Sequence, residues 1–186
     1  MKDANKKLSD LDAIAVSKGP GSYTGLRIGV STAKGLCYAL DKPLISIPTL
    51  QAMTRGAVKT HSVSGSHLPP LYCPMIDARR MEVYCAVYDE NLLEIKPTAA
   101  EILTEHSFGD LLLKYKIYFF GDGSSKFKSF LSGNSNAVYL EDNFVSARHM
   151  ITVATKKFSE KLFENLARFE PYYLKDFLTT TPKKLL

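Results

Sequence analysis

Metal-ligating and reactive residue types are scarce in this chain of 186 residues. It has four histidines, and none is followed by another histidine or a cysteine three or four positions later, which is the spacing that helical metal sites use. Its three cysteines form no Cys-x-x-Cys pair. Neither a Gly-x-x-x-x-Gly-Lys-Ser/Thr motif nor a Gly-x-Ser-x-Gly motif occurs. The sequence therefore predicts no metal site and no catalytic residue of these kinds.

Long apolar segments are also missing. No run approaches the ~18 residues that a membrane helix needs, and residues 1–7 have no signal-peptide core, so we expect a cytoplasmic protein. Cys37, Cys73 and Cys85 lie in apolar surroundings, which predicts buried, reduced thiols. A hydrophobic content of 45% is ordinary for one globular domain or two small lobes. The net charge of +5 permits an acidic partner or a nucleic acid.

The most informative stretch of the chain is glycine-rich and covers residues 17–29. It follows an almost continuously apolar segment at residues 11–16, which is typical of a strand covered on both faces. A helix capped by Ser22 or Thr24 and ending at Leu40 is predicted next. The apolar residues 44–47 then complete a β-α-β unit.

The predicted helix has two faces that favour burial. The core stripe consists of Leu26, Val30, Ala33, Cys37 and Leu40. The second stripe lies about 90° away and consists of Gly25, Gly29, Thr32 and Leu36. Each glycine inside a helix costs roughly 1 kcal/mol relative to alanine, so these two predict the close approach of another helix, from this chain or from a partner. Phosphate binding at the preceding turn and simple structural tightness are the alternatives.

The rest of the chain predicts a second α/β unit. A polar, turn-rich stretch at residues 61–70 is the candidate linker. An antiparallel hairpin follows at residues 71–76 and 81–88, and a third strand at residues 92–96. Helices are then predicted at residues 107–115 and 124–131, and strands at residues 117–120 and 137–140. Residues 146–167 form a predicted amphipathic helix, with Leu162 among its inward residues. Its outward side carries Lys156, Lys157 and Lys161, which predicts a solvated face or a contact with RNA.

Two turns with acidic residues are the remaining candidates for chemistry. Asp77 lies in the predicted hairpin turn, where it either orients a metal-bound phosphate or bonds its own backbone. Gly121, Asp122 and Gly123 lie at a strand-to-helix junction. They either approach a nucleotide or turn the chain. The sequence leaves both alternatives open.

Together these motifs resemble the TsaB (YeaZ) family. The resemblance follows the chain in order and rests on residues 19–29, 31–36, 76–84, 121–123 and 170–174. It implies an α/β fold of two related lobes, like that of actin, hexokinase and Hsp70 (the ASKHA fold). Residues 1–68 with 170–186 are then the first, partner-binding lobe, and residues 69–169 are the second.

The resemblance also implies a function. It predicts a non-catalytic subunit that binds TsaD in the complex making N6-threonylcarbamoyladenosine at position 37 of tRNAs that read ANN codons. TsaE joins the larger complex, tRNA is contacted indirectly, and the subunit forms a homodimer through much the same surface when alone. The predicted partner interface is Ser22, Gly25, Gly29, Thr32 and Leu36. No cofactor is expected in the chain itself, with ATP or ADP at the complex boundary left open. A vestigial nucleotide-binding set is Asp77, Gly121, Asp122 and Gly123.

The chain departs from its relatives in two places. TsaD carries a His-x-x-x-His pair for its metal, whereas the corresponding residues 48–53 contain no histidine, so the catalysis of TsaD is not carried over. The family also begins with a hairpin and a third strand, whereas this chain begins in the helix after them, so we expect a truncated gene model and an incomplete first lobe. An ATP-dependent enzyme or peptidase of the same fold and a direct tRNA-binding module are the rival functions.

Overall fold

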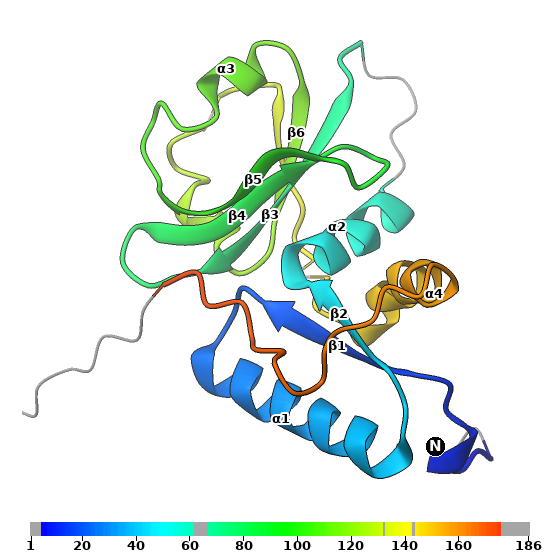
Figure 1. Ribbon diagram of the computed structural model, residues 1–186. Coiled ribbons are helices and arrows are strands. Elements are labelled where there is room, and N and C mark those ends of the chain that lie inside the picture. The colour runs from blue at the N-terminus through cyan, green and yellow to red at the C-terminus, as the bar shows by residue number, and fades with distance from the viewer. Residues whose placement is uncertain (1–4, 62–66, 132, 143, 176–186) are drawn as a thin grey trace, which may run out of the picture.

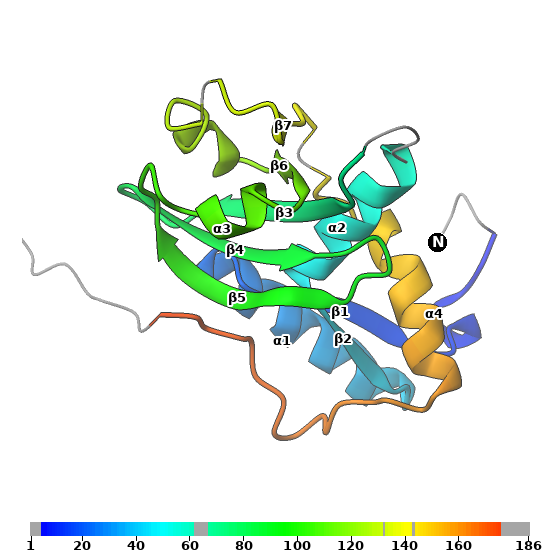
Figure 2. The ribbon, with the colours of Figure 1, turned by 90° about the horizontal axis from the view of Figure 1, so that it is seen from above.

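The computed structural model describes residues 5–61, 67–131, 133–142 and 144–175. Within these ranges the chain forms two sheets (Figure 1). The smaller has the strand order β1-β2, and the larger has the order β5-β4-β3-β6-β7. Figure 2 shows β5, β4 and β3 side by side above the smaller unit. The predicted pair of α/β units is therefore present.

The first unit is the predicted β-α-β arrangement. β1 (Ile14–Gly19) and β2 (Leu44–Pro48) pair in parallel, and α1 (Tyr23–Leu40) connects them. Ser22 caps α1, because its hydroxyl oxygen accepts the N–H of Gly25 at 3.4 Å. The core stripe is confirmed at Leu26, Val30, Ala33 and Cys37, while Leu40 is only half-buried.

The second unit contains the predicted hairpin. β3 (Pro70–Asp77) and β4 (Glu82–Tyr88) pair antiparallel, and β5 (Glu94–Ile102) continues on the far side of β4. β6 (Lys116–Phe120) pairs in parallel with β3, and β7 (Ala137–Tyr139) pairs in parallel with β6. The core of this sheet contains Cys73, Cys85, Phe108, Phe119 and Phe127. All three cysteines are buried and free, as predicted.

One helix, α2 (Thr49–Thr60), packs against both sheets. Its residue Ala52 lies in the small cluster with Ile45 and Ile47 of β2. Three other apolar side chains of α2 join a cluster under the larger sheet, made of Leu50, Met53, Ala57, Tyr72, Ala86, Tyr88, Tyr118 and Phe120. Because burial of apolar surface is the main stabilising term in folding, α2 joins the two units into one body.

The last predicted helix is wrong in its second half. A 3-10 turn, η4 (Ala147–Met150), leads into α4 (Ile151–Ser159), and the chain turns out of the helix at Lys161 with a φ of 55°. The N–H of Glu164 then donates to the carbonyl of Leu44 on β2 at 2.9 Å. Leu162, predicted to point inward, is 54% exposed. The unpaired edge of β2 offers hydrogen bonds that the helical pattern does not reveal.

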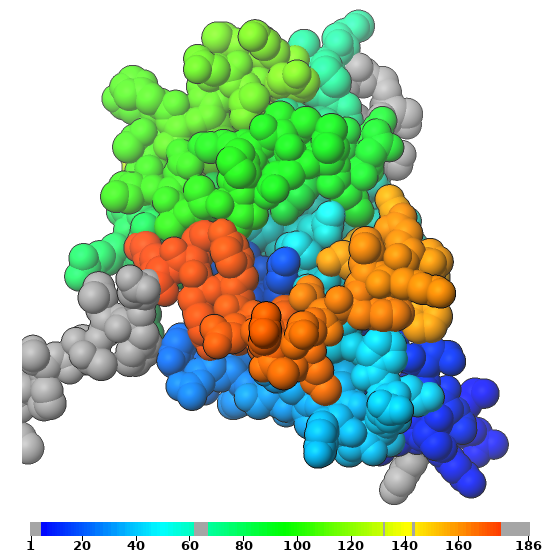
Figure 3. All heavy atoms as spheres, in the orientation of Figure 1, coloured from blue at the N-terminus to red at the C-terminus, as the bar shows by residue number. Residues whose placement is uncertain are grey.

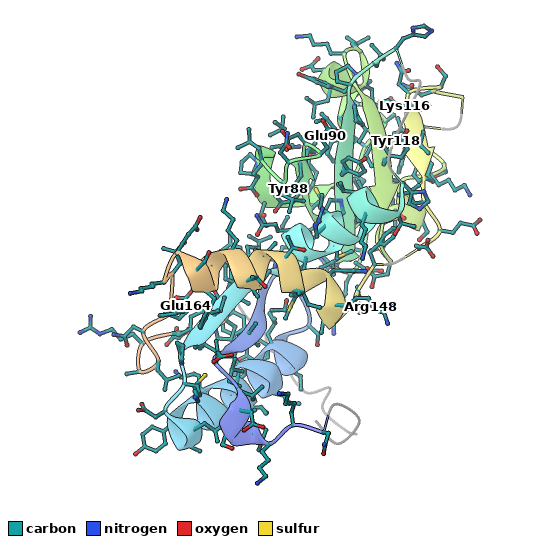
Figure 4. The ribbon with its side chains drawn as sticks, turned by 90° about the vertical axis from the view of Figure 1, so that its right-hand side faces the viewer. Tyr88, Glu90, Lys116, Tyr118, Arg148 and Glu164 are labelled. Carbon is teal, nitrogen blue, oxygen red and sulfur yellow. The ribbon has the colours of Figure 1, made fainter. Side chains whose placement is uncertain are left out.

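Of the three lysines predicted on the outer side of this helix, Lys156 and Lys161 are exposed as predicted, and Lys157 is not. The Nζ atom of Lys157 donates to the carbonyl of Ser46 on β2 at 2.8 Å. Burial, together with the charge of nearby Lys18, lowers the pKa of Lys157. Glu164 lies at the same edge (Figure 4) and accepts the hydroxyl of Ser46. We propose that α4 counts with the first lobe, although the predicted lobe boundary placed it in the second.

Smaller differences affect the other elements. α3 (Gly109–Leu112) and the 3-10 turn η3 (Ser124–Lys126) are shorter than the helices predicted there. Phe108 has a φ of 63° before α3, which excludes a longer helix at that end. β5 is longer than predicted, because it pairs with β4 as far as Ile102. β1 is half-exposed along most of its length, because it lies at an edge of the small sheet within the described residues.

The C-terminal segment, residues 165–175, runs back over the first unit toward the second (Figure 3). Lys34 of α1 donates to the carbonyl of Phe169 at 2.9 Å, and the N–H of Tyr172 donates to the carbonyl of Lys18 at 2.7 Å. Gly19 has a φ of 118°, and a Cβ there would lie 2.6 Å from the carbonyl oxygen of Tyr172. Only glycine therefore fits beneath this crossing.

Lys126 of η3 anchors the turn between β3 and β4, which we call the β3–β4 turn (residues 78–81). Its Nζ atom donates to Asp77 Oδ1 at 2.5 Å and to the carbonyl of Arg80 at 2.6 Å. The N–H of Arg79 donates to the same carboxylate oxygen at 2.6 Å. The bond from Lys126, and next the bond from Arg79, lower the pKa of Asp77. The turn is thus held from one side by a charged pair.

The crossing over Gly19 makes a stability prediction. We expect Gly19→Ala to lower the free energy of unfolding by about 1–3 kcal/mol, because both the positive φ and the Tyr172 carbonyl oppose a side chain. Gly21→Ala is the matched control, since its nearest neighbour is Leu26 Cγ at 3.9 Å, and it should change the value by less than about 0.5 kcal/mol. Urea unfolding measures both. Equal losses of unfolding free energy in the two variants would contradict the claim that the crossing requires glycine at position 19.

The Asp77–Lys126 pair predicts a pH dependence. Because the pKa of Asp77 is lowered in the folded state, its contribution is complete above pH about 4 and is lost as the pH falls through the lower native value. Asp77 is 43% exposed, so the contribution is at most about 1 kcal/mol. Urea unfolding from pH 7 to pH 2 should show a smaller loss in Lys126→Met than in the wild type. If the free energies of unfolding of the two proteins fell in parallel with pH, the contribution of the Asp77–Lys126 pair would be refuted.

Candidate functional site

A cleft of about 520 Å³ opens where three distant segments of the chain meet. The segments are the start of α1, the end of β3 with its turn, and the C-terminal segment, which Figure 3 shows between the two units. Its lining residues are Pro20, Gly21, Ser22, Tyr23, Thr24, Ile76, Asp77, Ala78, Arg79, Tyr84, Asp122, Tyr172, Tyr173, Leu174 and Lys175. The cleft therefore collects residues from both units.

Three residues from the predicted sets line this cleft. Ser22 comes from the predicted partner interface, and Asp77 and Asp122 come from the predicted nucleotide-binding set. The N–H of Asp77 donates to Asp122 Oδ1 at 2.9 Å. Asp122 thereby fastens the loop after β6 to the end of β3, and both acidic side chains have partners within the chain.

The two glycines of the nucleotide-binding set are packed against β3. A Cβ on Gly121, whose φ is 96°, would lie 2.3 Å from the carbonyl oxygen of Met75. A Cβ on Gly123 would lie 2.9 Å from Val83 Cγ1 and 3.0 Å from the carbonyl carbon of Ile76. Their missing side chains make room for this chain's own backbone. A nucleotide-binding role for them stays a prediction.

The predicted partner interface on α1 is open on its outer side. Gly25 and Thr32 are exposed, and Gly29 and Leu36 are half-exposed. A Cβ on Gly29 would meet only Val16 at 3.9 Å, and a Cβ on Gly25 would meet only Ser22. Within the described residues, a Cβ at either glycine would lie within 4 Å of no atom of another helix. Packing inside the chain therefore does not explain the two glycines.

The glycine turn before α1 makes room for the C-terminal segment, which crosses over Gly19. Gly19 lies beneath Tyr172, and the ring of Tyr173 lies 5.0 Å from the ring of Tyr23 on the first turn of α1. The C-terminal segment thus covers part of this turn. Of the alternatives for the glycine stretch, structural tightness accounts for Gly19, whereas it does not account for Gly25 and Gly29.

Other chemistry has little support in the part of the chain that the structure describes. No group of three or more His, Cys, Asp or Glu side chains there is placed to hold a metal ion. No helix among the described residues has the length and apolar character to cross a membrane. His67 and His106 are exposed, and the Nδ1 atom of His149 contacts the carbonyl of Phe144 at 2.7 Å.

Several residues of the cleft are not predicted from sequence as site residues. Arg79, Tyr84 and the segment Tyr172–Lys175 all line it, and Lys126 supports it from behind. Their only sequence signal is that residues 76–84 and 170–174 belong to the motifs that carry the family resemblance. Lys126 has no such signal, because its role depends on a contact with a distant turn.

Comparisons with known proteins agree with this architecture. The family model of TsaD, described as tRNA N6-adenosine threonylcarbamoyltransferase, matches residues 1–186. The TsaB protein of Escherichia coli is 30% identical over 182 residues, which covers 91% of this chain and 73% of that protein. The Bacillus subtilis TsaB protein is 40% identical over 88 residues, which covers 47% of this chain and only 35% of that protein.

Solved structures show the same fold. A Pseudomonas aeruginosa protein described as similar to peptidase YEAZ superposes with a TM-score of 0.73 at 21% identity, covering 94% of this chain and 78% of that one. A structure of YeaZ from the same organism gives a TM-score of 0.72 over 93% of this chain and 79% of that one. The chain belongs to the TsaB (YeaZ) family, within the wider family that the TsaD model describes, and has its two-lobed, actin/hexokinase/Hsp70-like α/β fold.

Proposed function

We propose that this protein is a non-catalytic subunit that pairs with TsaD in the synthesis of N6-threonylcarbamoyladenosine on tRNA. The curated relatives from E. coli and B. subtilis are named tRNA threonylcarbamoyladenosine biosynthesis proteins, which supports the pathway. The open stripe of small residues on α1 is the observation that carries the pairing.

The stripe supports a helix partner by its shape. Glycines four positions apart lie on one face of a helix and allow a second backbone to come close. Gly25 and Gly29 have that spacing, and neither is used for packing within the described chain. Ile28 borders the stripe and is 64% exposed. An exposed apolar side chain beside such a stripe favours burial against another protein.

A scaffold role is also supported over an enzyme of the same fold. Asp77 and Asp122, the acidic residues of the cleft, are occupied by hydrogen bonds within the chain. The described residues include no cluster that could ligate a metal. In the proposed assembly TsaD carries the chemistry, TsaE joins the larger complex in the cytoplasm, and ATP or ADP binds at the subunit boundary. When alone, the chain pairs with a second copy through the same stripe.

The pairing predicts a mutational pattern on α1. Gly29→Leu should prevent co-elution with TsaD, because the larger side chain projects where the partner helix approaches. The fold is kept, since a Cβ at Gly29 meets only Val16 Cγ2, at an ordinary contact distance of 3.9 Å. Gly29→Ala should weaken co-elution less. Ser31→Leu is the control, because it places the same side chain on an exposed position about 200° round the helix.

Size-exclusion chromatography of the mixed proteins tests this pattern, with circular dichroism to show that each variant is folded. The proposal requires that Gly29→Leu separates from TsaD and that Ser31→Leu does not. Normal co-elution of folded Gly29→Leu would contradict the assignment of the α1 stripe as the TsaD interface.

The scaffold role predicts that the purified chain hydrolyses neither ATP nor peptides above background. Asp122→Asn is the reference variant, because its amide oxygen still accepts the N–H of Asp77. Steady-state assays of the two proteins should therefore agree. A rate in the wild type that Asp122→Asn abolishes would support the enzyme instead.

A further inference from the structure

Two consecutive arginines occupy a conformation that their side chains do not favour. Arg79 and Arg80, in the β3–β4 turn, have φ values of 68° and 52°. Residues other than glycine seldom adopt this region, and asparagine or glycine adopts it more readily. The backbone of the turn therefore gives no reason for arginine at either position.

The turn is built as a rigid support for these arginines. Lys126, which is only 17% exposed, bonds the carboxylate of Asp77 and the carbonyl of Arg80 from beneath. The nearby carboxylate of Glu82 is paired with Lys175. Within the described ranges, neither guanidinium group of the turn is in an ion pair. Both arginines are exposed, so their charges are available to an anionic ligand.

Aromatic rings stand beside this positive rim. Arg79 lines the cleft together with Tyr84 from β4 and with Tyr172 and Tyr173 from the C-terminal segment. Single-stranded nucleic acids are bound by such a combination, in which cations hold phosphates and aromatic faces stack on unpaired bases. An acidic peptide offers carboxylates to the arginines, but it has no unpaired bases to stack on the tyrosine rings.

We propose that this rim, defined as Arg79, Arg80 and the tyrosine-lined mouth of the cleft, binds RNA directly. The two guanidinium groups bind backbone phosphates, and an unpaired base of a loop stacks on Tyr84. The inference rests on the proposed function, because a tRNA-modifying complex brings an RNA with unpaired loops to this subunit. It adds a direct RNA contact to a subunit otherwise assigned only to hold TsaD.

The test is fluorescence anisotropy of a labelled RNA stem-loop with the full chain at several salt concentrations. Arg79→Asn/Arg80→Asn removes both charges and suits the positive φ, so its melting temperature should be equal or higher. Its affinity should fall at least about tenfold, and the slope of log K against log salt should become shallower by about 1.4, at about 0.7 for each phosphate contact.

Arg148→Ala/Arg168→Ala is the matched control, because it removes the same charge from two exposed positions. Arg148 belongs to η4, at the start of α4 (Figure 4), and neither arginine lines the cleft. This variant should change the affinity less than about twofold. Unchanged binding by the turn variant, or an equal loss in the control, overturns the proposal.

Stacking is tested separately at Tyr84. Tyr84→Phe should keep the affinity, and Tyr84→Leu should lower it about tenfold without changing the salt slope, since stacking releases no counterions. Equal affinities for the two variants overturn the stacking role. Displacement of the RNA by polyglutamate as readily as by unlabelled RNA would identify an acidic-peptide site and overturn RNA binding.

Co-elution with TsaD separates this inference from the proposed function. The variant Arg79→Asn/Arg80→Asn should still co-elute with TsaD, because the turn does not belong to the α1 stripe. A wild-type chain that binds TsaD and does not bind the stem-loop overturns the RNA site alone. A chain that binds the stem-loop and does not bind TsaD supports the RNA site and contradicts the pairing.

Discussion

The hydrogen bond from the N–H of Tyr172 to the carbonyl of Lys18 holds the C-terminal segment against the start of α1. It explains the glycine at position 19, because a side chain there would meet the Tyr172 carbonyl. It also brings Tyr173 onto Tyr23 and leads Lys175 to Glu82. Without this bond the cleft would lose one of its three walls, since four of its lining residues belong to the same segment, Tyr172–Lys175.

Apolar burial holds the two units together in this fold, and polar contacts orient the segments around the cleft. α2 contributes side chains to clusters under both sheets and so fixes how the two units lie. The free energy of apolar burial is roughly proportional to the buried area and has no direction, so it does not orient individual groups. The hydrogen bonds of Lys126 at the β3–β4 turn and of Asp122 at the end of β3 orient these segments. The proposed TsaD and RNA surfaces are both built on this frame.

The elements of the fold were more predictable than their ends. The β-α-β unit and the β3–β4 hairpin follow from apolar periodicity and are confirmed. The helix predicted over residues 146–167 stops at Ser159, because the chain leaves it to bond the edge of β2. Periodicity describes which face of a segment is apolar. It contains no information about an unpaired carbonyl group on another strand, such as that of Leu44. The same limit hid the inward turn of Lys157.

The sequence by itself determined the two α/β units, the capped helix with its buried stripe, and the glycine stripe beside it, because these depend on neighbours within a few residues. Only the tertiary structure decided that Gly121 and Gly123 make room for β3. It also decided that Arg79, Tyr84 and Tyr172 share one cleft. These groups are far apart along the chain, and packing between segments brings them together, which no local pattern of residue types encodes.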